Sequence, residues 1–516
     1  MVKKYFDSND MVTKERQNCT AAAKMPRPGV IVVVRDKETG YINAAPYSGG
    51  VLSIKPFQIV FGVKSWDAKF TYKDADEFVV SIPKKSQIDH MWVMACSVPH
   101  GINEIEIANW NELPSKQINT PGIKECPINL ECKTAHFIQL KQPLRAIIVA
   151  DVIGINMDAS LLNMRRSEAI KQIPIFEASW NTYTGLYGPS VLDGEMLGYI
   201  ETNSKSRNEL LTEENNDEKV YISRNEFYYE KNQNILSNAI WPMPSYVLCS
   251  TDEVNRLCGS PVTGGLLMSA RPAIQVPVLK DSIPYKNIKR NNEFVLSIPV
   301  RSQITSFEEL IDNPNNIKAA GLTALKKNQI NTPGIMEYPV NIDCKVVRFD
   351  DIPGSDYSLL IGEKVGISVD NEILEYKDMM DLYSQFLYSV RDKEMKRRWS
   401  FHDKNNLSVK PLPSWGSRYY GGWLLVPENF QYGMYYWLIE LVESAYLSKA
   451  EFDQIRIWLT WWRREGYLAP EDLRSELKQR LTTLFKMMVW AHRDFDKWHK
   501  IKEYLAQFPL EKETVL

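Results

Sequence analysis

Two patterns of apolar and polar positions divide this chain. Up to about residue 422, short apolar runs rich in β-branched residues alternate with turn residues, as in Gly29–Val34 (GVIVVV), Gln58–Val63 (QIVFGV) and Ala146–Val152 (AIIVADV). Such runs predict strands, and many short strands with few helices between them predict a β-barrel or a β-sandwich. After Pro427 the spacing of apolar residues becomes helical. The chain is therefore expected to be mainly β, with α-helices at its C-terminal end.

The C-terminal helical pattern is rich in tryptophan. Ser448 and Glu451 form the capping-box pattern that begins a helix, and Pro470 is placed to open a second helix. Of the 14 tryptophans in the chain, six lie beyond residue 430. Because the apolar residues recur on one helical face, they predict a small helical bundle with an aromatic core. The same aromatic stripe would also suit packing against the strand domains or against a partner protein.

One stretch of the strand region occurs twice. Gln117–Lys133 reads QINTPGIKECPINLECK and Gln329–Lys345 reads QINTPGIMEYPVNIDCK, at an offset of 212 residues. Upstream, Glu77–Pro83 (EFVVSIP) is repeated as Glu293–Pro299 (EFVLSIP), at an offset of 216 residues. A period of this length is too long for a solenoid repeat and indicates a duplicated domain.

The duplication divides the chain into five parts. We expect an N-terminal arm at 1–25, a first strand domain at 26–188, a polar linker at 189–241, a second strand domain at 242–422 and a Trp-rich helical domain at 423–516. The arm is polar and is expected to be loose. The linker contains the acidic, polar stretch Glu201–Lys219, which is typical of a solvated connector, with a strand or two expected near Val220–Tyr229.

The bulk composition argues against several classes of protein. A net charge of −2 gives no electrostatic case for binding nucleic acid or an anionic membrane. No apolar run approaches the ~20 residues that a membrane-spanning helix needs, and the chain start lacks the apolar core of a secretion signal. Seven cysteines without a Cys-x-x-Cys pair fit a reducing compartment, so we expect a cytoplasmic protein. The six histidines show no metal-ligand spacing, and no metal site is expected.

The segment Ile42–Phe61 (INAAPYSGGVLSIKPFQIVF) is the best candidate for chemistry. A predicted strand is interrupted there by Ala-Ala-Pro, carries the polar side chains of Asn43 and Ser48, and continues through Gly49-Gly50. Small residues let backbone N–H groups approach a flat ring closely, and Asn and Ser offer hydrogen bonds to the edge of a polar heterocycle. An ordinary hairpin corner would use the same residues. The nucleophile elbow Gly-x-Ser-x-Gly and the P-loop are both absent, so the usual hydrolase and nucleotide-phosphate sites are not predicted.

Both copies carry a series of short motifs in the same order. In the first copy they are Arg27-Pro28, Asn43–Ser48, Glu77–Val80, Thr120–Ile123 and Pro127–Cys132, and in the second they are Pro261–Gly265, Lys280–Ser282, Asn287-Ile288 and Glu293–Val295. In this order the motifs resemble the flavin reductase-like family, the FMN-binding split β-barrel. The similarity covers roughly 26–188 and 242–422 and leaves the linker and the helical domain outside.

The resemblance implies a fold and a cofactor. Members of this family fold as Greek-key barrels, usually pair as homodimers, and hold FMN near the dimer interface. We therefore expect two tandem FMN-binding split β-barrels, mainly β with α, that pair within one chain as an intramolecular pseudo-dimer. The C-terminal α-helical domain is an addition to this arrangement.

The resemblance also implies site residues. The family's ring-contacting corner falls on Asn43, Ala44, Ala45, Pro46 and Ser48. Its phosphate-binding Lys-Asp-Thr stretch falls poorly on the first copy, where Ser65, Lys69 and Thr71 are nearest, and well on Lys280, Asp281 and Ser282 of the second copy. In the second copy, however, Cys258–Pro261 replaces the ring-contacting corner. We therefore expect fewer than two intact flavin sites, with one built around the first copy, and we assign no catalytic acid or base.

The function implied by the resemblance is that of an FMN-dependent oxidoreductase passing hydride between NADH or NADPH and flavin. A small-molecule substrate or a flavin-using enzyme would be a further partner. Hydride transfer depends on parallel rings at close range more than on a general acid. Two alternatives stay open: an FMN enzyme that oxidises or reduces a small organic substrate, and a flavin-binding or scaffold protein without catalysis.

Overall fold

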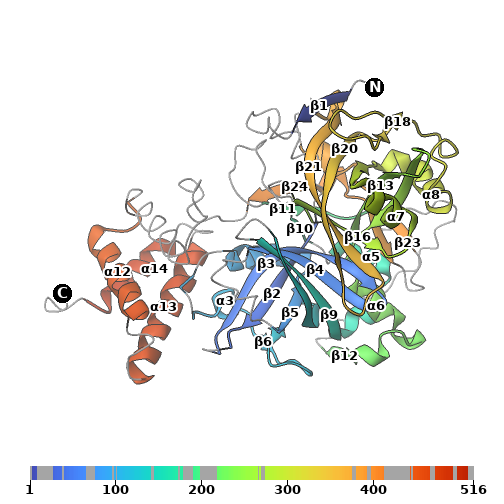
Figure 1. Cartoon of the computed structure of the whole chain (residues 1–516). Helices are drawn as coiled ribbons and strands as arrows, with labels where there is room; N and C mark the ends of the chain where they lie inside the picture. Colours follow the sequence, from blue (N-terminus) through green and yellow to red (C-terminus); the bar gives the residue numbers. More distant parts are fainter. Residues whose placement is uncertain are drawn as a thin grey trace.

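The computed structural model of the protein describes residues 3–7, 27–37, 40–64, 76–95, 98–99, 101–140, 145–172, 175–177, 190–197, 218–264, 267–268, 273–374, 379–391, 397–411, 442, 445–464, 471–491 and 497–509. These residues form two β-barrels and a C-terminal group of helices (Figure 1).

The first barrel closes on itself. Its strands run in the order β2-β3-β4-β9-β8-β5, and β5 returns to β2, where Val32 pairs with Val80. Val30, Val32 and Val34 of β2 fill the interior, because successive residues of a strand point to opposite faces. The strands are β2 (Arg27–Arg35), β3 (Ile42–Ile54), β4 (Phe57–Lys64), β5 (Glu77–Ile82), β8 (Ile128–Gln139) and β9 (Arg145–Asp158).

The second barrel repeats this order with one difference. The place of the single strand β3 is taken by two strands, β14 and β15, and β17 closes the barrel on β13, where Leu248 pairs with Leu296. The strands are β13 (Met243–Thr251), β14 (Leu257–Thr263), β15 (Leu267–Met268), β16 (Ala273–Leu279), β17 (Glu293–Ile298), β20 (Val340–Asp351) and β21 (Tyr357–Asp370).

The stretch that occurs twice in the sequence builds the same buried hydrogen bonds in both barrels. Asn129 Oδ1 accepts from Ser81 Oγ at 2.6 Å and from the N–H of Ile123 at 2.8 Å. Asn341 Oδ1 accepts from the corresponding groups of the second barrel at 2.6 Å and 2.8 Å. Because an unpaired buried polar group costs about 1–3 kcal/mol, each barrel needs the whole motif.

Each barrel is extended by one extra strand, and in the sequence this strand lies just before the other barrel. The two strands are β1 (Lys3–Asp7) and β12 (Lys219–Ser223). β1 pairs with β21 of the second barrel, and β12 pairs with β9 of the first. Lys3 Nζ lies 2.6 Å from Asp370 Oδ1, and Lys219 Nζ lies 2.6 Å from Asp158 Oδ1. These contacts are equivalent, so the exchange of strands is reciprocal, as across a two-fold axis.

The described parts of the N-terminal arm and of the linker contain strands and a helix. The arm contains β1, and the linker contains β11 (Ser190–Asp193), the expected strand β12 and the helix α6 (Gln233–Ala239). β1, β11 and α6 were not predicted, whereas β12 was expected. Both β1 and β12 pair with backbone groups at the edge of a barrel strand, and each buries one apolar side chain, Phe6 in β1 and Ile222 in β12. Residues 201–217, most of the acidic stretch, lie outside the described residues.

An apolar seam joins the two barrels. Ile147 and Val149 of β9 pack in one cluster with Leu359 and Ile361 of β21, and all four are at most 3% exposed. The two pairs occupy equivalent positions in the two barrels. Fully burying one such side chain contributes about 1.5–3 kcal/mol, so this cluster holds the halves face to face. The barrels thus form the intramolecular pseudo-dimer predicted from the sequence.

The C-terminal helices pack against the first barrel through α2 and α3 (Figure 1). Trp458, Trp462 and Trp498 lie in the same buried cluster as Val33 of β2, and the Trp490 indole N–H donates to Ile107 O at 2.9 Å. The aromatic stripe is thus both the core of the helical group and its contact with the barrel. The helices are α2 (Ile88–Met94), α3 (Glu104–Ile107), α12 (Lys449–Arg464), α13 (Glu471–Ala491) and α14 (Trp498–Ala506).

Shorter elements complete the described structure. They are β6 (Glu112–Leu113), β7 (Gly122–Ile123), β10 (Ile175–Glu177), β18 (Ala324–Leu325), β19 (Gly334–Ile335), β22 (Tyr388–Arg391), β23 (Arg397–Ser400), β24 (Ser408–Pro411), α4 (Ala159–Asn163), α5 (Arg166–Gln172), α7 (Ile283–Asn291), α8 (Ile304–Asp312), α9 (Asn371–Leu374) and α10 (Met379–Tyr383). Of the helices in the described part of the chain, none is long and apolar enough to cross a bilayer.

Candidate functional site

The five residues of the predicted corner, Asn43, Ala44, Ala45, Pro46 and Ser48, lie in the half of β3 that pairs with β2. Ala45 packs in the barrel interior, whereas Ala44 packs outward among residues of α2 and α3. Since side chains alternate along a strand, Pro46 and Ser48 share the outward face with Ala44. Pro46 is half-buried and the other four are buried. The structure therefore brings all five together on one strand but divides them between its two faces.

A buried carboxylate that the sequence analysis missed holds this corner from outside. Glu104 of α3 is 2% exposed, and its Oε2 accepts the N–H of Ala44 at 3.2 Å. α3 begins at Asn103, whose side chain accepts from the N–H of Ile105 at 3.0 Å. Asn is a common N-cap residue, so Asn103 was a sequence signal for this short helix. Which strand Glu104 would reach depends on tertiary packing, and no local pattern shows it.

The same strand touches the second barrel further along. The N–H of Val51 donates to Met243 Sδ at 3.4 Å. Gly264 has φ of +96°, and a Cβ there would lie 2.7 Å from Val51 O. Only glycine suits this position, because it needs both the left-handed conformation and the close approach. The corner thus lies on a strand that reaches the junction of the two barrels.

Gly49 has a packing role. A Cβ on Gly49 would lie 2.1 Å from Cε1 of Phe61, whose ring covers it from the neighbouring strand β4. Phe61 also meets Phe78 edge to face, with ring centroids 6.2 Å apart. The flat ring that this glycine accommodates is therefore the ring of Phe61.

The phosphate-binding candidates of the first copy, Ser65, Lys69 and Thr71, lie outside the described residues and stay predictions.

In the second copy, Lys280, Asp281 and Ser282 form the turn that leads into α7. Asp281 has φ of +64°. Lys280 Nζ donates to Ser355 O at 2.9 Å, and Ser282 Oγ caps the helix by accepting from the N–H of Tyr285 at 3.4 Å. Pro284 removes one of the free N–H groups with which a helix start binds an anion. The structure brings the three residues together, but the Lys280 and Ser282 groups already have protein partners.

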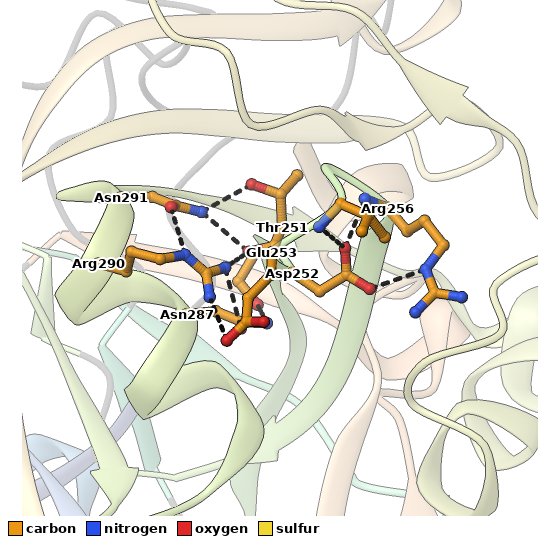
Figure 2. Close-up of polar contacts among 9 residues, drawn as sticks. Thr251, Asp252, Glu253, Arg256, Asn287, Arg290 and Asn291 are labelled. Atoms are coloured by element: carbon orange, nitrogen blue, oxygen red, sulfur yellow. Dashed lines mark hydrogen bonds and ion pairs between the residues drawn. The ribbon is translucent and has the colours of Figure 1, made fainter.

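Behind this turn, side chains fasten α7 to the β13–β14 hairpin (Figure 2). Arg290 Nη2 donates to Thr251 O at 2.8 Å, and Asn291 Nδ2 donates to both oxygens of Thr251 at 2.8 Å. Within the hairpin, Arg256 Nε donates to Asp252 Oδ2 at 2.8 Å. These bonds satisfy the polar groups within the protein, so the cluster stabilises the second barrel.

The corner of the second barrel has a different composition. The strand register places Cys258 where the first barrel has Asn43, and Gly259 where it has Ala44. The N–H of Gly259 donates to Pro314 O at 2.8 Å, so a backbone carbonyl replaces the carboxylate of Glu104. Burial raises the pKa of the Cys258 thiol, which is therefore neutral.

The two copies differ at the predicted site. The first has Ser48 beside half-buried Pro46 on the outward face of the strand, and its Asn43 lies on the opposite face. The second copy has a thiol in place of the amide, and two of the three side chains in its phosphate turn are engaged. Among the described residues, no group of His, Cys, Asp and Glu could hold a metal ion.

Known proteins resemble both halves. The model of the flavin reductase like domain matches residues 22–169 and 240–385. An uncharacterised protein of Methanothermobacter thermautotrophicus is 34% identical over 119 residues, which cover 23% of this chain and 56% of that protein, so the match spans little more than half of its length. An uncharacterised protein of Halalkalibacterium halodurans is 26% identical over 194 residues, which cover 36% of this chain and 92% of that protein.

Solved structures resemble about a third of the chain. Nitrilotriacetate monooxygenase component B from Bacillus cereus is 27% identical, with a TM-score of 0.30 and coverage of 33% of this chain and 89% of that one. Flavoredoxin of Desulfovibrio vulgaris is 20% identical, with a TM-score of 0.27 and coverage of 32% and 87%. The family model covers more than half of the chain and matches both barrels. The chain therefore belongs to the flavin reductase-like family, of which it carries two copies.

Proposed function

We propose that the protein is an FMN-dependent oxidoreductase that transfers hydride between NADH or NADPH and flavin, at one site built around the first barrel. Membership of the flavin reductase-like family supports a flavin-related oxidoreductase. The observation that carries the finer proposal is the corner from Ala44 to Ser48, on the strand that reaches the second barrel at Val51. The electrons pass on to a small-molecule substrate or to a flavin-using partner enzyme.

Bound FMN supplies the two-electron hydride chemistry, and the chain positions it. Pro46 offers a rigid apolar surface against the ring, and the Ser48 hydroxyl is a hydrogen-bonding group on the same face. Glu104 keeps the strand in place by accepting the N–H of Ala44. Ser65, Lys69 and Thr71 are the candidates for the phosphate, whose charge suits one cation and hydroxyl donors.

The test compares one substitution at equivalent places in the two barrels. The strand register aligns Pro46 with Pro261, and both are half-buried. Pro46→Trp would fill the proposed ring site, whereas Pro261→Trp would fill its counterpart. The full-length protein is reconstituted with FMN, the flavin per chain is measured from the visible spectrum, and NADH or NADPH is titrated anaerobically.

We expect one FMN per chain in the wild type, bleaching by one nicotinamide, and loss of FMN binding in Pro46→Trp only. Circular dichroism confirms that both variants are folded. Two FMN per chain, or loss of flavin in Pro261→Trp alone, would overturn the one-site proposal. Bound FMN that neither nicotinamide reduces would overturn the hydride transfer.

A further inference from the structure

An open cleft lies between α3 and α13, where the helical domain meets the first barrel. Its volume is about 560 Å³, within the range of small-molecule sites. Glu106 of α3 lines it, whereas Glu104, two positions earlier, faces β3. Residues two apart point to nearly opposite sides of a helix. Because Glu106 lines the cleft and Glu104 contacts β3, the cleft and the strand β3 lie on opposite sides of α3. Figure 1 shows α3 next to α13.

One face of α13 forms a wall of the cleft. Thr483, Lys486, Met487 and Trp490 all line it, and their spacings of three and four residues place them next to one another on the helix surface. The indole of Trp490 is fixed because its N–H donates to Ile107 O at 2.9 Å. Trp490 and Met487 therefore offer a preorganised apolar surface of the kind that stacks on an aromatic ring.

The charged residues that line the cleft are Glu106, Lys486 and Lys497, the last at the start of α14. Lys486 lies on α13 and Glu106 on α3, and within the described parts of the chain neither forms an ion pair. The Thr483 hydroxyl is engaged by Tyr504 of α14. A carboxylate would receive a charge-assisted hydrogen bond from Lys486. Glu106 would accept a hydrogen bond from an O–H or N–H at the other end of the ligand.

We propose that this cleft binds a small aromatic carboxylate that also carries a hydroxyl or amino group. The ring lies on Trp490 and Met487, its carboxylate meets Lys486, and its donor meets Glu106. The proposal concerns binding alone and does not rest on the flavin chemistry proposed above.

The test uses isothermal titration calorimetry on the full-length protein near neutral pH. The probes are 4-hydroxybenzoate, benzoate (no donor) and phenol (no carboxylate). The variants are Lys486→Met and Glu106→Gln. The matched control is Lys500→Met on α14, an exposed lysine that does not line the cleft.

We expect 4-hydroxybenzoate to bind about tenfold more tightly than phenol, as one charge-assisted hydrogen bond implies. Lys486→Met should remove that difference, and Glu106→Gln should weaken 4-hydroxybenzoate more than benzoate. Lys500→Met should change nothing. The proposal is overturned by the absence of saturable heat for 4-hydroxybenzoate, by equal affinity for phenol, or by unchanged binding in Lys486→Met.

Discussion

The rings of Phe176 and Tyr388 meet edge to face, with centroids 5.0 Å apart and planes at 70°. Phe176 pairs with Pro28 in the first barrel, and Tyr388 pairs with Pro244 in the second. The two residues therefore occupy the same position in the two halves. Equivalent residues touch each other only where a two-fold axis passes. This contact marks the pseudo-two-fold axis of the chain.

We expect Phe176→Ala to destabilise the pairing of the barrels. Phe176 and Tyr388 are both 0% exposed, and truncating a buried Phe typically costs about 3–5 kcal/mol. Urea unfolding measures the loss, which should be accompanied by separate transitions for the two barrels. The control is Tyr229→Ala, since Tyr229 is 52% exposed and such surface changes usually stay within about 0.5 kcal/mol. A loss no larger than that of the control would contradict the role of Phe176.

The exchanged strands allow a second, reciprocal test. A Cβ on Gly366 of β21 would lie 2.0 Å from the Tyr5 hydroxyl, and one on Gly154 of β9 would lie 2.2 Å from the Tyr221 hydroxyl. Gly366→Ala should therefore loosen β1, and Gly154→Ala should loosen β12, each by about 1–3 kcal/mol. Hydrogen exchange of the backbone amides in 3–7 and 219–223 reports the two strands separately. Each variant is the control for the other, and equal protection in both would refute the exchange.

How far the sequence predicts this fold depends on the length of the repeated signal. Seventeen aligned residues in Gln117–Lys133 and Gln329–Lys345 were enough to identify the duplication. The exchanged strands share only a Lys-x-Tyr, at Lys3 and Lys219, with the offset of 216 residues seen elsewhere. Two matching residues do not rise above chance. Periodicity shows that a segment suits a strand, but it does not show which distant edge that strand joins.

The candidate site, like the fold, could be predicted only in part from the sequence. The resemblance placed the corner on Asn43 to Ser48, and the structure does bring those residues together. The resemblance did not show that Glu104 accepts a hydrogen bond from Ala44 or that the ring of Phe61 covers Gly49. Both contacts join separate segments of the chain, and a local sequence pattern does not show which segments meet. Small residues are therefore ambiguous in sequence, since they accommodate either a ligand or a neighbouring side chain.

A third prediction concerns an ion pair found in the second barrel. Lys327 Nζ lies 2.9 Å from Asp343 Oδ1, and both side chains are 0% exposed. Burial lowers the pKa of Lys327 and raises that of Asp343, and each partner opposes the shift of the other. The first barrel has Ser115 and Glu131 at the equivalent places, and Glu131 accepts from backbone N–H groups instead.

Lys327→Met should therefore cost about 3–5 kcal/mol of unfolding free energy, because it leaves a buried carboxylate without its cation. The double variant Lys327→Met/Asp343→Leu should recover most of that loss, since an apolar pair of similar volume is often neutral. Chemical denaturation of the two single variants and the double variant gives the coupling energy. If the loss of stability in the double variant equals the sum of the two single losses, Lys327 and Asp343 are not coupled, and the result contradicts the structure.

The last prediction concerns His402, which is 1% exposed and packs edge to face against the rings of both Phe176 and Tyr388 at the pseudo-two-fold axis. Burial, assisted by the charge of Lys85, lowers the pKa of His402 from 6.5 to about 3. Between these values the unfolded chain binds a proton that the folded chain does not bind. The free energy of unfolding should therefore fall as the pH drops from about 6.5 towards 3, by up to about 1.4 kcal/mol per pH unit from this residue alone.

Carboxylates also titrate in this range, so the contribution of His402 is isolated by comparison with His402→Leu. This variant keeps an apolar side chain against the rings of Phe176 and Tyr388. Urea unfolding at a series of pH values should show a steeper acid loss for the wild type than for the variant, and the two slopes should agree above about pH 7, where a histidine is neutral in either state. Parallel curves would mean that His402 is protonated as readily in the folded protein as in the unfolded chain. Such a result would contradict the burial of His402 against Phe176 and Tyr388, because a buried unpaired charge is too costly to retain.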